Sequence, residues 1–240
     1  MRDVYTGIDI GTYHVKVVLC APAENPESPM HIIGTGTATS KGMRHGYIVD
    51  VNEAKKSIRE ALDRAQTAAK VRVRSARLGI GGIGLDEIHS TGSTTLTASG
   101  GIVTDQVIDR AKRESEKQAS SKLVNRNIIH TIPLEHKIDG LTVLGQPHGL
   151  QGTKLSVDTL IITMLAQHHD DLIEAVEGAG VEVEGVMASP LAASLVTLTK
   201  TQKMAGVCLA NIGSETISIV IFDNDIPISL KVFPVGASDI

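Results

Sequence analysis

The sequence is poor in aromatic side chains and has no excess of basic charge. Its 240 residues include no Trp, two Phe and three Tyr. Single-stranded nucleic acids are bound by stacking bases on aromatic rings, and this chain offers few rings for that purpose. Its 23 Lys and Arg are outnumbered by 27 Asp and Glu, which gives a net charge of −4. Because polyanion binders carry a basic excess, we expect no nucleic-acid partner.

Cysteine is equally scarce, and long apolar runs are absent. Cys20 and Cys208 lie far apart, each inside an apolar run. This placement predicts buried, reduced thiols in a cytosolic protein rather than a disulfide framework or a metal site. No segment approaches the roughly 20 apolar residues that cross a bilayer, and the N-terminus lacks the apolar core of a signal peptide. We therefore expect any membrane contact to be peripheral.

What is present is enough apolar side chain, 42% of the residues, for the core of one large or two ordinary domains. The first third of the chain predicts a hairpin over residues 4–20 that turns at 11–13, followed by a third antiparallel strand at 31–39. A helix over 53–70, capped by Asp50 or Asn52, and a strand at 76–81 follow. Three meandering strands, a crossover helix and a fourth strand make up this opening.

The remainder alternates between strand-like and helix-like patterns. A Ser/Thr/Gly-rich segment at 89–101 precedes a polar helix at 104–119, and together they indicate an inserted subdomain. The other predicted elements are strands at 127–138 and 153–165, a helix at 169–179, a strand at 181–187, a helix at 189–199, and strands at 206–212, 216–222 and 226–233.

Two of the predicted hairpins share one plan. Asp9-Ile10-Gly11-Thr12 and Asn211-Ile212-Gly213-Ser214 each place a polar residue, an apolar residue, Gly and Thr or Ser between apolar strands. A small-residue turn exposes successive backbone N–H groups that can hold phosphate oxygens. A carboxylate beside it can hold a hydrated Mg²⁺ ion. An ordinary structural hairpin explains either motif alone, but the pair favours two facing phosphate loops.

The first loop, Gly7-Ile8-Asp9-Ile10-Gly11-Thr12 with Lys16, resembles the first phosphate loop of the actin, Hsp70 and sugar-kinase superfamily. Further motifs resemble one branch of it, the FtsA family of bacterial cell-division proteins. They are Ser40-Lys41-Gly42-Met43 leading to Gly46, Ile48 and Asp50; Ile129-His130 with Ile132-Pro133, Glu135 and Ile138-Asp139; Gly149-Leu150 with Gly152 and Lys154-Leu155; and Ser189-Pro190-Leu191-Ala192-Ala193-Ser194. The block from Ile129 to Thr163 is the most discriminating one.

This resemblance implies an α/β fold: a ribonuclease-H-like (actin-like) mixed sheet with helices, interrupted by a small inserted α/β domain called SHS2 or 1C. It divides the chain into subdomain 1A at 1–84, SHS2 at 85–163, a return to 1A at 164–205, and an incomplete start of the second half, 2A, at 206–240. We expect a truncated member, without the rest of the adenosine pocket, the FtsZ-binding subdomain or a C-terminal membrane helix.

The resemblance also implies a function. FtsA-like proteins link FtsZ filaments to the inner face of the cytoplasmic membrane at the division site, polymerise, and use nucleotide as a conformational ligand. The implied cofactors are ATP and Mg²⁺, and the implied partners are FtsZ, other division proteins and further copies bound through SHS2. Its glycine-rich loop at 140–152 is where we expect partner contacts to gather. The implied nucleotide contacts are Gly11, Thr12, Tyr13, His14, Lys16, Gly213, Ser214, Glu215 and Thr216, with Asp9 and a degenerate Asn211 on the metal side.

The second loop departs from the family pattern. FtsA-like proteins generally read Asp-Ile-Gly-Gly-Gly-Thr there, whereas this chain has Asn211 in place of the Asp and Glu215 in place of a Gly. Asn supplies no negative charge for Mg²⁺, and Glu215 would face phosphate as a like charge. We therefore expect weak nucleotide binding, at most weak ATPase activity and no catalytic residue in this chain.

Two other functions remain open: a PilM-like pilus platform protein and, less favoured, a sugar or acetate kinase. No acceptor-activating carboxylate or nucleophile spacing of a kinase or hydrolase is recognisable. His168-His169-Asp170-Asp171 resembles a metal cluster, but capping of the following helix explains its acids. The basic stretch Lys70, Arg72, Arg74 and Arg77 could touch anionic lipid, although simple exposure explains it better.

Overall fold

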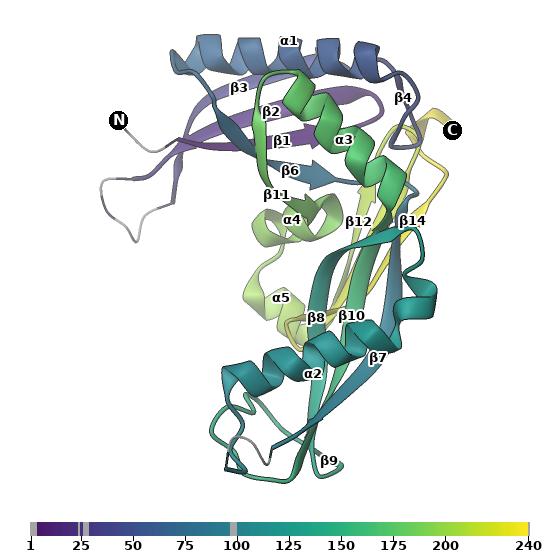
Figure 1. Ribbon diagram of the computed structural model, residues 1–240. Coiled ribbons are helices and arrows are strands. Elements are labelled where there is room, and N and C mark those ends of the chain that lie inside the picture. The colour runs from purple at the N-terminus through teal and green to yellow at the C-terminus, as the bar shows by residue number, and fades with distance from the viewer. Residues whose placement is uncertain (1–3, 24, 26–28, 97–99, 240) are drawn as a thin grey trace.

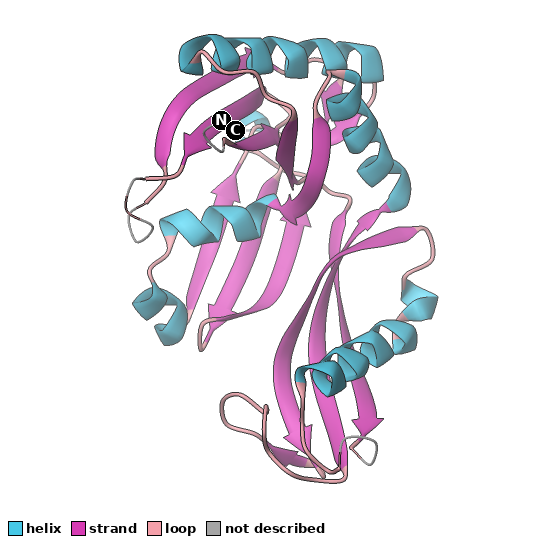
Figure 2. Cartoon of the chain, turned by 60° about the vertical axis from the view of Figure 1, so that its left-hand side comes forward, coloured by secondary structure: helices cyan, strands magenta, loops and turns pink. Residues whose placement is uncertain are grey.

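The computed structural model describes residues 4–23, 25, 29–96 and 100–239. Its strands form three main sheets, which the two views in Figures 1 and 2 separate. The first sheet has five strands in the order β11-β6-β1-β2-β3. They are β1 (Tyr5–Ile10), β2 (His14–Ala21), β3 (His31–Thr39), β6 (Ser75–Ile80) and β11 (Glu182–Ala188). β1, β2 and β3 pair antiparallel, whereas β6 pairs parallel with both β1 and β11.

Helix α1 (Val51–Ala69) covers one face of this sheet (Figure 1). Asp50 is its N-cap, and the carboxylate accepts hydrogen bonds from the backbone N–H groups of Asn52 and Glu53. The helix lies so close to β3 that a Cβ added at Gly36 would sit 1.9 Å from the carbonyl oxygen of Ala61. Glycine at this strand position therefore sets the helix-to-sheet distance.

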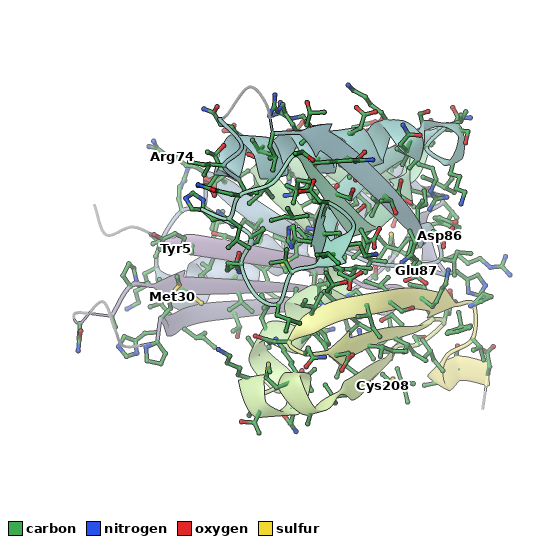
Figure 3. All side chains as sticks on the ribbon, turned by 90° about the horizontal axis from the view of Figure 1, so that it is seen from below. Tyr5, Met30, Arg74, Asp86, Glu87 and Cys208 are labelled. Atoms are coloured by element: carbon green, nitrogen blue, oxygen red, sulfur yellow. The ribbon has the colours of Figure 1, made fainter. Side chains whose placement is uncertain are left out.

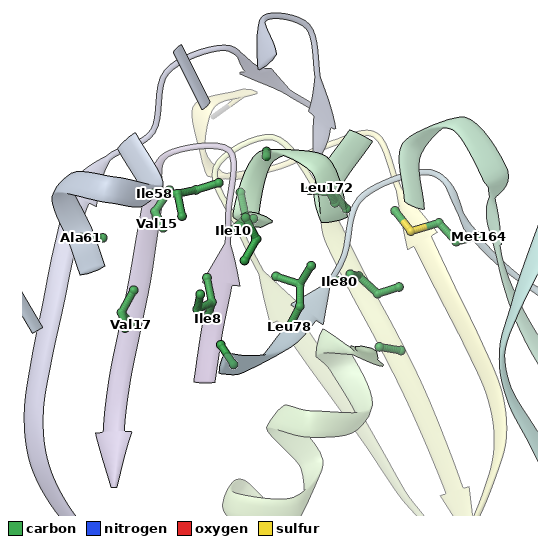
Figure 4. Close-up of a cluster of buried hydrophobic side chains, with 14 of the residues drawn as sticks. Ile8, Ile10, Val15, Val17, Ile58, Ala61, Leu78, Ile80, Met164 and Leu172 are labelled. Atoms are coloured by element: carbon green, nitrogen blue, oxygen red, sulfur yellow. The ribbon is translucent and has the colours of Figure 1, made fainter. Parts of the chain in front are cut away.

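The core of this part is aliphatic, as the scarcity of aromatic residues requires. Figure 4 shows alternate residues of β1 and β2, including Ile8, Ile10, Val15 and Val17, pointing between the sheet and its helices. Ile58 of α1 packs among them and is fully buried. Period-two burial on the strands and helical spacing on α1 together account for this layer.

The second sheet, in the order β7-β10-β8-β9, belongs to the inserted segment and carries helix α2 on one face (Figure 2). Its elements are β7 (Leu85–Thr95), α2 (Asp105–Gln118), a short 3-10 turn (Ser120–Lys122), β8 (Arg126–Ile138), β9 (Leu141–Thr142) and β10 (Lys154–Leu165). In the second half of β10, Leu160, Ile162 and Met164 pack into the main core, while Ile161 packs with Ile88 and Ala119. Burial on both faces explains why this half of the strand is mostly apolar, with the buried Thr163 between Ile162 and Met164.

The third sheet follows a helical connection. α3 (Ala166–Gly178) packs beside α1 and leads to β11, after which come α4 (Ser189–Thr197) and α5 (Lys200–Ala205). The sheet itself consists of β12 (Val207–Ile212), β13 (Ile217–Asp223) and β14 (Ile226–Phe233), and a 3-10 turn (Ala237–Asp239) ends the described chain. A small hairpin of β4 (Met43–Arg44) and β5 (Tyr47–Ile48) lies beside this C-terminal part (Figure 1).

The predicted fold class is confirmed: an actin-like mixed α/β sheet is interrupted by a small inserted α/β domain. The Ser/Thr/Gly-rich segment at 89–101, to which the sequence assigned no secondary structure, forms the second half of β7 as far as Thr95. Its Ser, Thr and Gly residues form a strand because they pair residue by residue with β10. Among the described residues, no helix combines the length and the apolarity needed to cross a membrane.

Three predictions need correction. Helix α3 begins at Ala166, so His168 to Asp171 lie inside the helix, and its N-cap Leu165 makes no side-chain capping bond. The helix predicted over 189–199 is present as α4 but ends at Thr197, and a second helix that was not predicted, α5, begins at Lys200 with Thr199 as its cap. The two thiols are not buried as predicted: Cys20 is half-buried, and Cys208 is exposed because it lies beside the exposed Ile221 on the outer face of the third sheet.

Candidate phosphate-binding cleft

The first candidate loop is the turn between β1 and β2. The backbone N–H of Gly11 donates to the carbonyl oxygen of His14 at 3.0 Å, which closes a two-residue turn over Thr12 and Tyr13. A Cβ added at Gly11 would lie 3.0 Å from that same oxygen. Glycine is thus favoured here by a close backbone approach.

The second candidate loop, between β12 and β13, repeats this geometry. Gly213 N–H donates to the carbonyl oxygen of Thr216 at 2.8 Å. A Cβ at Gly213 would again lie 3.0 Å from the accepting oxygen. The two hairpins are therefore built in the same way, as their sequences indicated. The last described residues pack onto the second loop, where Ala237 N–H donates to Gly213 and Ser238 N–H to Ser214, both at 2.9 Å.

The two loops face each other across one cleft of about 540 Å³. Of the residues assigned to the nucleotide site from the sequence, those on the cleft wall are Asp9, Gly11, Thr12, Tyr13, His14, Lys16, Asn211, Gly213, Ser214 and Thr216. Tertiary structure thus brings together two motifs that lie about 200 residues apart in the chain. Whether they bind nucleotide stays a prediction.

Glu215 does not belong to the cleft lining. Its carboxylate Oε2 accepts a hydrogen bond from the backbone N–H of His45 at 2.6 Å, in the turn between β4 and β5. In the same turn, Gly46 N–H donates to Thr12 Oγ1 at 3.0 Å. We expected the Glu215 carboxylate to face phosphate as a like charge. It instead accepts a hydrogen bond from the β4–β5 turn at the edge of the cleft.

The only acid assigned to the metal side is already engaged. One oxygen of Asp9 lies 3.3 Å from Lys16 Nζ, and the other accepts from Ser189 Oγ at 3.2 Å. Asn211 across the cleft is neutral. A hydrated Mg²⁺ ion favours anionic oxygen ligands, so this donor set fits it poorly. Within the described part of the chain, no cluster of three or more His, Cys, Asp or Glu residues could hold a metal ion.

Several cleft residues were not assigned to the site from the sequence. Gly46, Gly81, Gly82, Ser189, Pro190, Ala237 and Ser238 also line the cleft. Ser189-Pro190 and Gly46 stood within the motifs that resemble FtsA. Their place in the cleft depends on contacts between distant segments, which local patterns do not predict.

The other candidate clusters have structural explanations. His168 stacks on Tyr47 with ring centroids 3.3 Å apart. Burial lowers the pKa of His168, with Asp171 opposing, so the ring is mostly neutral at pH 7. His169 Nδ1 lies 2.9 Å from the side-chain nitrogen of Asn127. The four basic residues of the 70–77 stretch are all exposed.

The inserted domain is joined to the third sheet by a polar contact, which Figure 3 shows at Asp86 and Glu87 beside β14. Glu87 accepts the backbone N–H of Leu230 at 2.6 Å and the hydroxyl of Ser229 at 3.0 Å. Lys231 Nζ lies 3.1 Å from Asp86 and 3.4 Å from Glu87. The Glu87 side chain is only 10% exposed. This contact links the start of β7 in the inserted domain to β14.

Comparison with known proteins agrees with this architecture. A family model described as the SHS2 domain inserted in FtsA matches residues 84–163. Curated relatives include the cell division protein FtsA of Bacillus subtilis, 30% identical over 239 residues that cover 100% of this chain and 53% of that protein. The FtsA proteins of Pseudomonas aeruginosa and Escherichia coli are 27% and 26% identical, with 98% and 97% of this chain and 55% and 54% of those proteins covered. The chain thus spans about half the length of these relatives.

Two solved structures share the fold. A PilM-PilN type IV pilus biogenesis complex matches with a TM-score of 0.70 at 16% identity, covering 100% of this chain and 64% of that chain. The ethanolamine utilization protein EutJ from Carboxydothermus hydrogenoformans matches with a TM-score of 0.52 at 12% identity, covering 100% and 54%. At these identities the likeness shows the fold alone. The sequence relatives and the SHS2 match are the more specific findings: over its whole length the chain is similar to FtsA cell division proteins, and it carries the SHS2 domain that is inserted in them.

Proposed function

We propose that this chain serves in bacterial cell division as the nucleotide-responsive part of an adaptor that links FtsZ filaments to the membrane. The observation that carries this proposal is the pair of identically built loops that face one cleft, in a chain related to FtsA along its whole length. Small-residue turns with outward N–H groups suit phosphate oxygens. A ligand that touches both loops would favour one relative placement of the two sheets that carry them.

Nucleotide phosphates would lie between Gly11–His14 on one side and Gly213–Thr216 on the other. Lys16 is 58% exposed and lies at the cleft, so its ammonium group can turn toward an anion. ATP is the proposed ligand, and Mg²⁺ would contribute little because Asn211 is neutral and Asp9 is paired. We propose a conformational role for the nucleotide, with at most weak hydrolysis.

The proposed partners are FtsZ, other division proteins and further copies of the chain, met at the cytoplasmic face of the membrane where the cell divides. Self-association would use the inserted domain at 85–163, between the parts of 1A at 1–84 and 164–205 and the beginning of 2A at 206–240. The far tip of the inserted domain exposes Leu141 and Leu144, whose exposed fractions are 76% and 95%. Exposed apolar side chains on a loop are typical of contact surfaces.

Titration calorimetry with ATP, with and without Mg²⁺, tests the nucleotide proposal directly. We expect binding that is weaker than micromolar and depends little on Mg²⁺. Gly213→Asp should abolish it, because a carboxylate would enter the phosphate position and a Cβ would crowd the Thr216 carbonyl oxygen. Gly185→Ala, on β11 with open space around its Cα, is the matched control. Micromolar Mg-ATP affinity, or equal binding by the Gly213 variant, contradicts the proposal.

Cosedimentation with FtsZ filaments asks separately whether these residues contact FtsZ. Since the family resemblance implies that the FtsZ-binding subdomain lies outside them, retention in the FtsZ pellet would reveal a further FtsZ contact within these residues. No retention at concentrations where filaments form would leave the FtsZ link to the remainder of the adaptor. The PilM-like alternative is less well supported, because that likeness rests on 16% identity while the curated relatives at 25–30% identity are FtsA proteins.

A further inference from the structure

The turn between β4 and β5 holds both candidate loops at once. His45 and Gly46 form a two-residue turn closed by the pair Arg44 and Tyr47. Both have positive φ, 48° and 82°, which is the geometry of a type I′ turn. In such a turn the two central N–H groups take no part in the hairpin ladder. Here one donates to Glu215 of the second loop and the other to Thr12 of the first.

The turn itself is held firmly. The carbonyl oxygen of His45 accepts from Ile83 N–H at 3.2 Å. Gly46 lies against Gly82 so closely that a Cβ added at Gly46 would sit 2.3 Å from the Gly82 Cα. Gly46 is buried and lines the cleft. The two N–H donors therefore have a fixed position at the cleft edge, where Glu215 and Thr12 meet them.

The acceptor on the second loop is an anion. Successive N–H groups of a positive-φ turn form a concavity that attracts negative charge, and a charged acceptor makes the stronger hydrogen bond. The Nδ1 atom of His45 also lies 3.1 Å from the Glu215 carbonyl oxygen and 3.8 Å from its Oε2. His45 thus contacts Glu215 through its backbone and its ring.

We propose that the Glu215 carboxylate acts as a built-in anion that holds the two loops together without nucleotide. His45 and Gly46 form the clasp: one N–H binds the internal carboxylate and the next binds the Thr12 hydroxyl. Because the clasp already holds the two loops in one relative position, nucleotide binding changes that position little. ATP therefore changes the structure of this cleft less than it would change a cleft that lacks the carboxylate. The response to ATP rests on the proposed function, whereas the unliganded clasp does not.

Hydrogen exchange at the His45 and Gly46 amides, followed by mass spectrometry on the whole chain without ligand, tests the clasp. Glu215→Ala should speed exchange there by about tenfold, and Glu215→Gln by less, because the amide keeps an acceptor but loses the charge. Glu182→Ala removes the same charge from an exposed site on β11 and should change nothing there. Circular dichroism establishes that each variant is folded, and the Gln variant still decides the matter if the Ala variant unfolds.

Equal exchange in the wild-type chain and both Glu215 variants would overturn the clasp. Added ATP, without Mg²⁺, separates this inference from the proposed function. We expect ATP to restore protection in Glu215→Ala and to change the wild type by less than about twofold. Loss of protection in Glu215→Ala with no response to ATP supports the clasp and contradicts nucleotide binding. A wild-type turn that exchanges as fast as the variant until ATP is added contradicts the clasp.

Discussion

At the scale of single residues, the cleft is electrostatically one-sided. Asp9 and Asn211 occupy equivalent places before the two glycine turns, but only Asp9 carries charge, and Lys16 already neutralises it at 3.3 Å. The Lys16 ammonium group can turn from Asp9 toward an anionic ligand, which would free the Asp9 carboxylate for a metal ion. The Asn211 amide, by contrast, stays neutral in any arrangement. The residue at 211 therefore limits metal-dependent binding more than Asp9 does.

Asn211→Asp should make nucleotide binding depend on Mg²⁺. A second carboxylate facing the cleft adds about 1 kcal/mol of attraction for a nearby cation in solvated surroundings, or roughly fivefold in affinity. Calorimetric titration of ATP with and without Mg²⁺ measures the difference. Asn211→Ala should behave like the wild type, and an equal gain in both variants would show that charge is not the cause.

At the scale of elements, helices dock on strands through glycine. α1 approaches β3 at Gly36, and α2 approaches β7 at Gly92, where an added Cβ would lie 2.0 Å from the Ala111 carbonyl oxygen. The obstructing atoms are backbone in both places, so a side chain cannot be accommodated by a rotamer change. Small residues thus fix the distance between layers in the main and in the inserted domain.

Gly92→Ala should destabilise the inserted domain by about 1–3 kcal/mol, the usual cost of overpacking. Thermal unfolding followed by circular dichroism measures this loss. Gly185→Ala, in a strand position with nothing within 4 Å of the added Cβ, should leave stability unchanged or slightly increased. A similar loss in both variants would attribute the effect to glycine flexibility and not to helix docking.

The contact between β7 and β14 is the main polar link of the inserted domain to the third sheet. Glu87→Ala leaves the Leu230 N–H and the Ser229 hydroxyl without their acceptor, at a cost of about 1–3 kcal/mol. Thermal unfolding and limited proteolysis between the domains report this change. Glu87→Gln retains an acceptor and should lose less, and no loss in either variant would mean that solvent replaces the contact fully.

The same contact should weaken in acid. Burial raises the pKa of Asp86, but hydrogen bonds from the Glu87 backbone and Lys231 outweigh it and hold the pKa below the ordinary 3.8. Because the folded-state pKa is lowered, this stabilisation is present above about pH 4 and is lost as the pH falls through the lowered value. The difference in Tm between the wild type and Asp86→Asn should hold between about pH 6 and 8 and vanish in strong acid. A difference that persists there would exclude the ion pair as its cause.

At the scale of the whole molecule, the inserted domain projects away from the cleft and ends in an apolar tip (Figure 1). If the chain self-associates through this tip, deletion of 141–148 should shift sedimentation toward the monomer. Leu144→Ser should weaken association by about tenfold or more, since burying a leucine contributes roughly 1.5–3 kcal/mol. Val124→Ser, at a residue 69% exposed elsewhere on this domain, is the control. An unchanged profile for the deletion in a chain that does associate would remove the tip from the interface.

The sequence by itself determined the local structure of this protein. Period-two runs in the strands, helical spacing after the Asp50 cap, and the repeated Gly-Thr and Gly-Ser turns each depend on residues close together in the chain. For that reason the main sheet, α1 and the two matching hairpins were predictable. The motifs around Ile129 to Thr163 were specific enough to indicate the SHS2 domain through their resemblance to the FtsA family, and the SHS2 match over 84–163 agrees.

Only the tertiary structure decided which distant groups meet. Glu215 faces His45, 170 residues away, so a residue expected to oppose phosphate from within the cleft lies outside its lining. The strand at β7 forms because β10 pairs with it, and Cys208 is exposed because its sheet face is uncovered. These outcomes depend on three-dimensional neighbours, and a local pattern carries no information about a partner that the fold brings in from elsewhere in the chain.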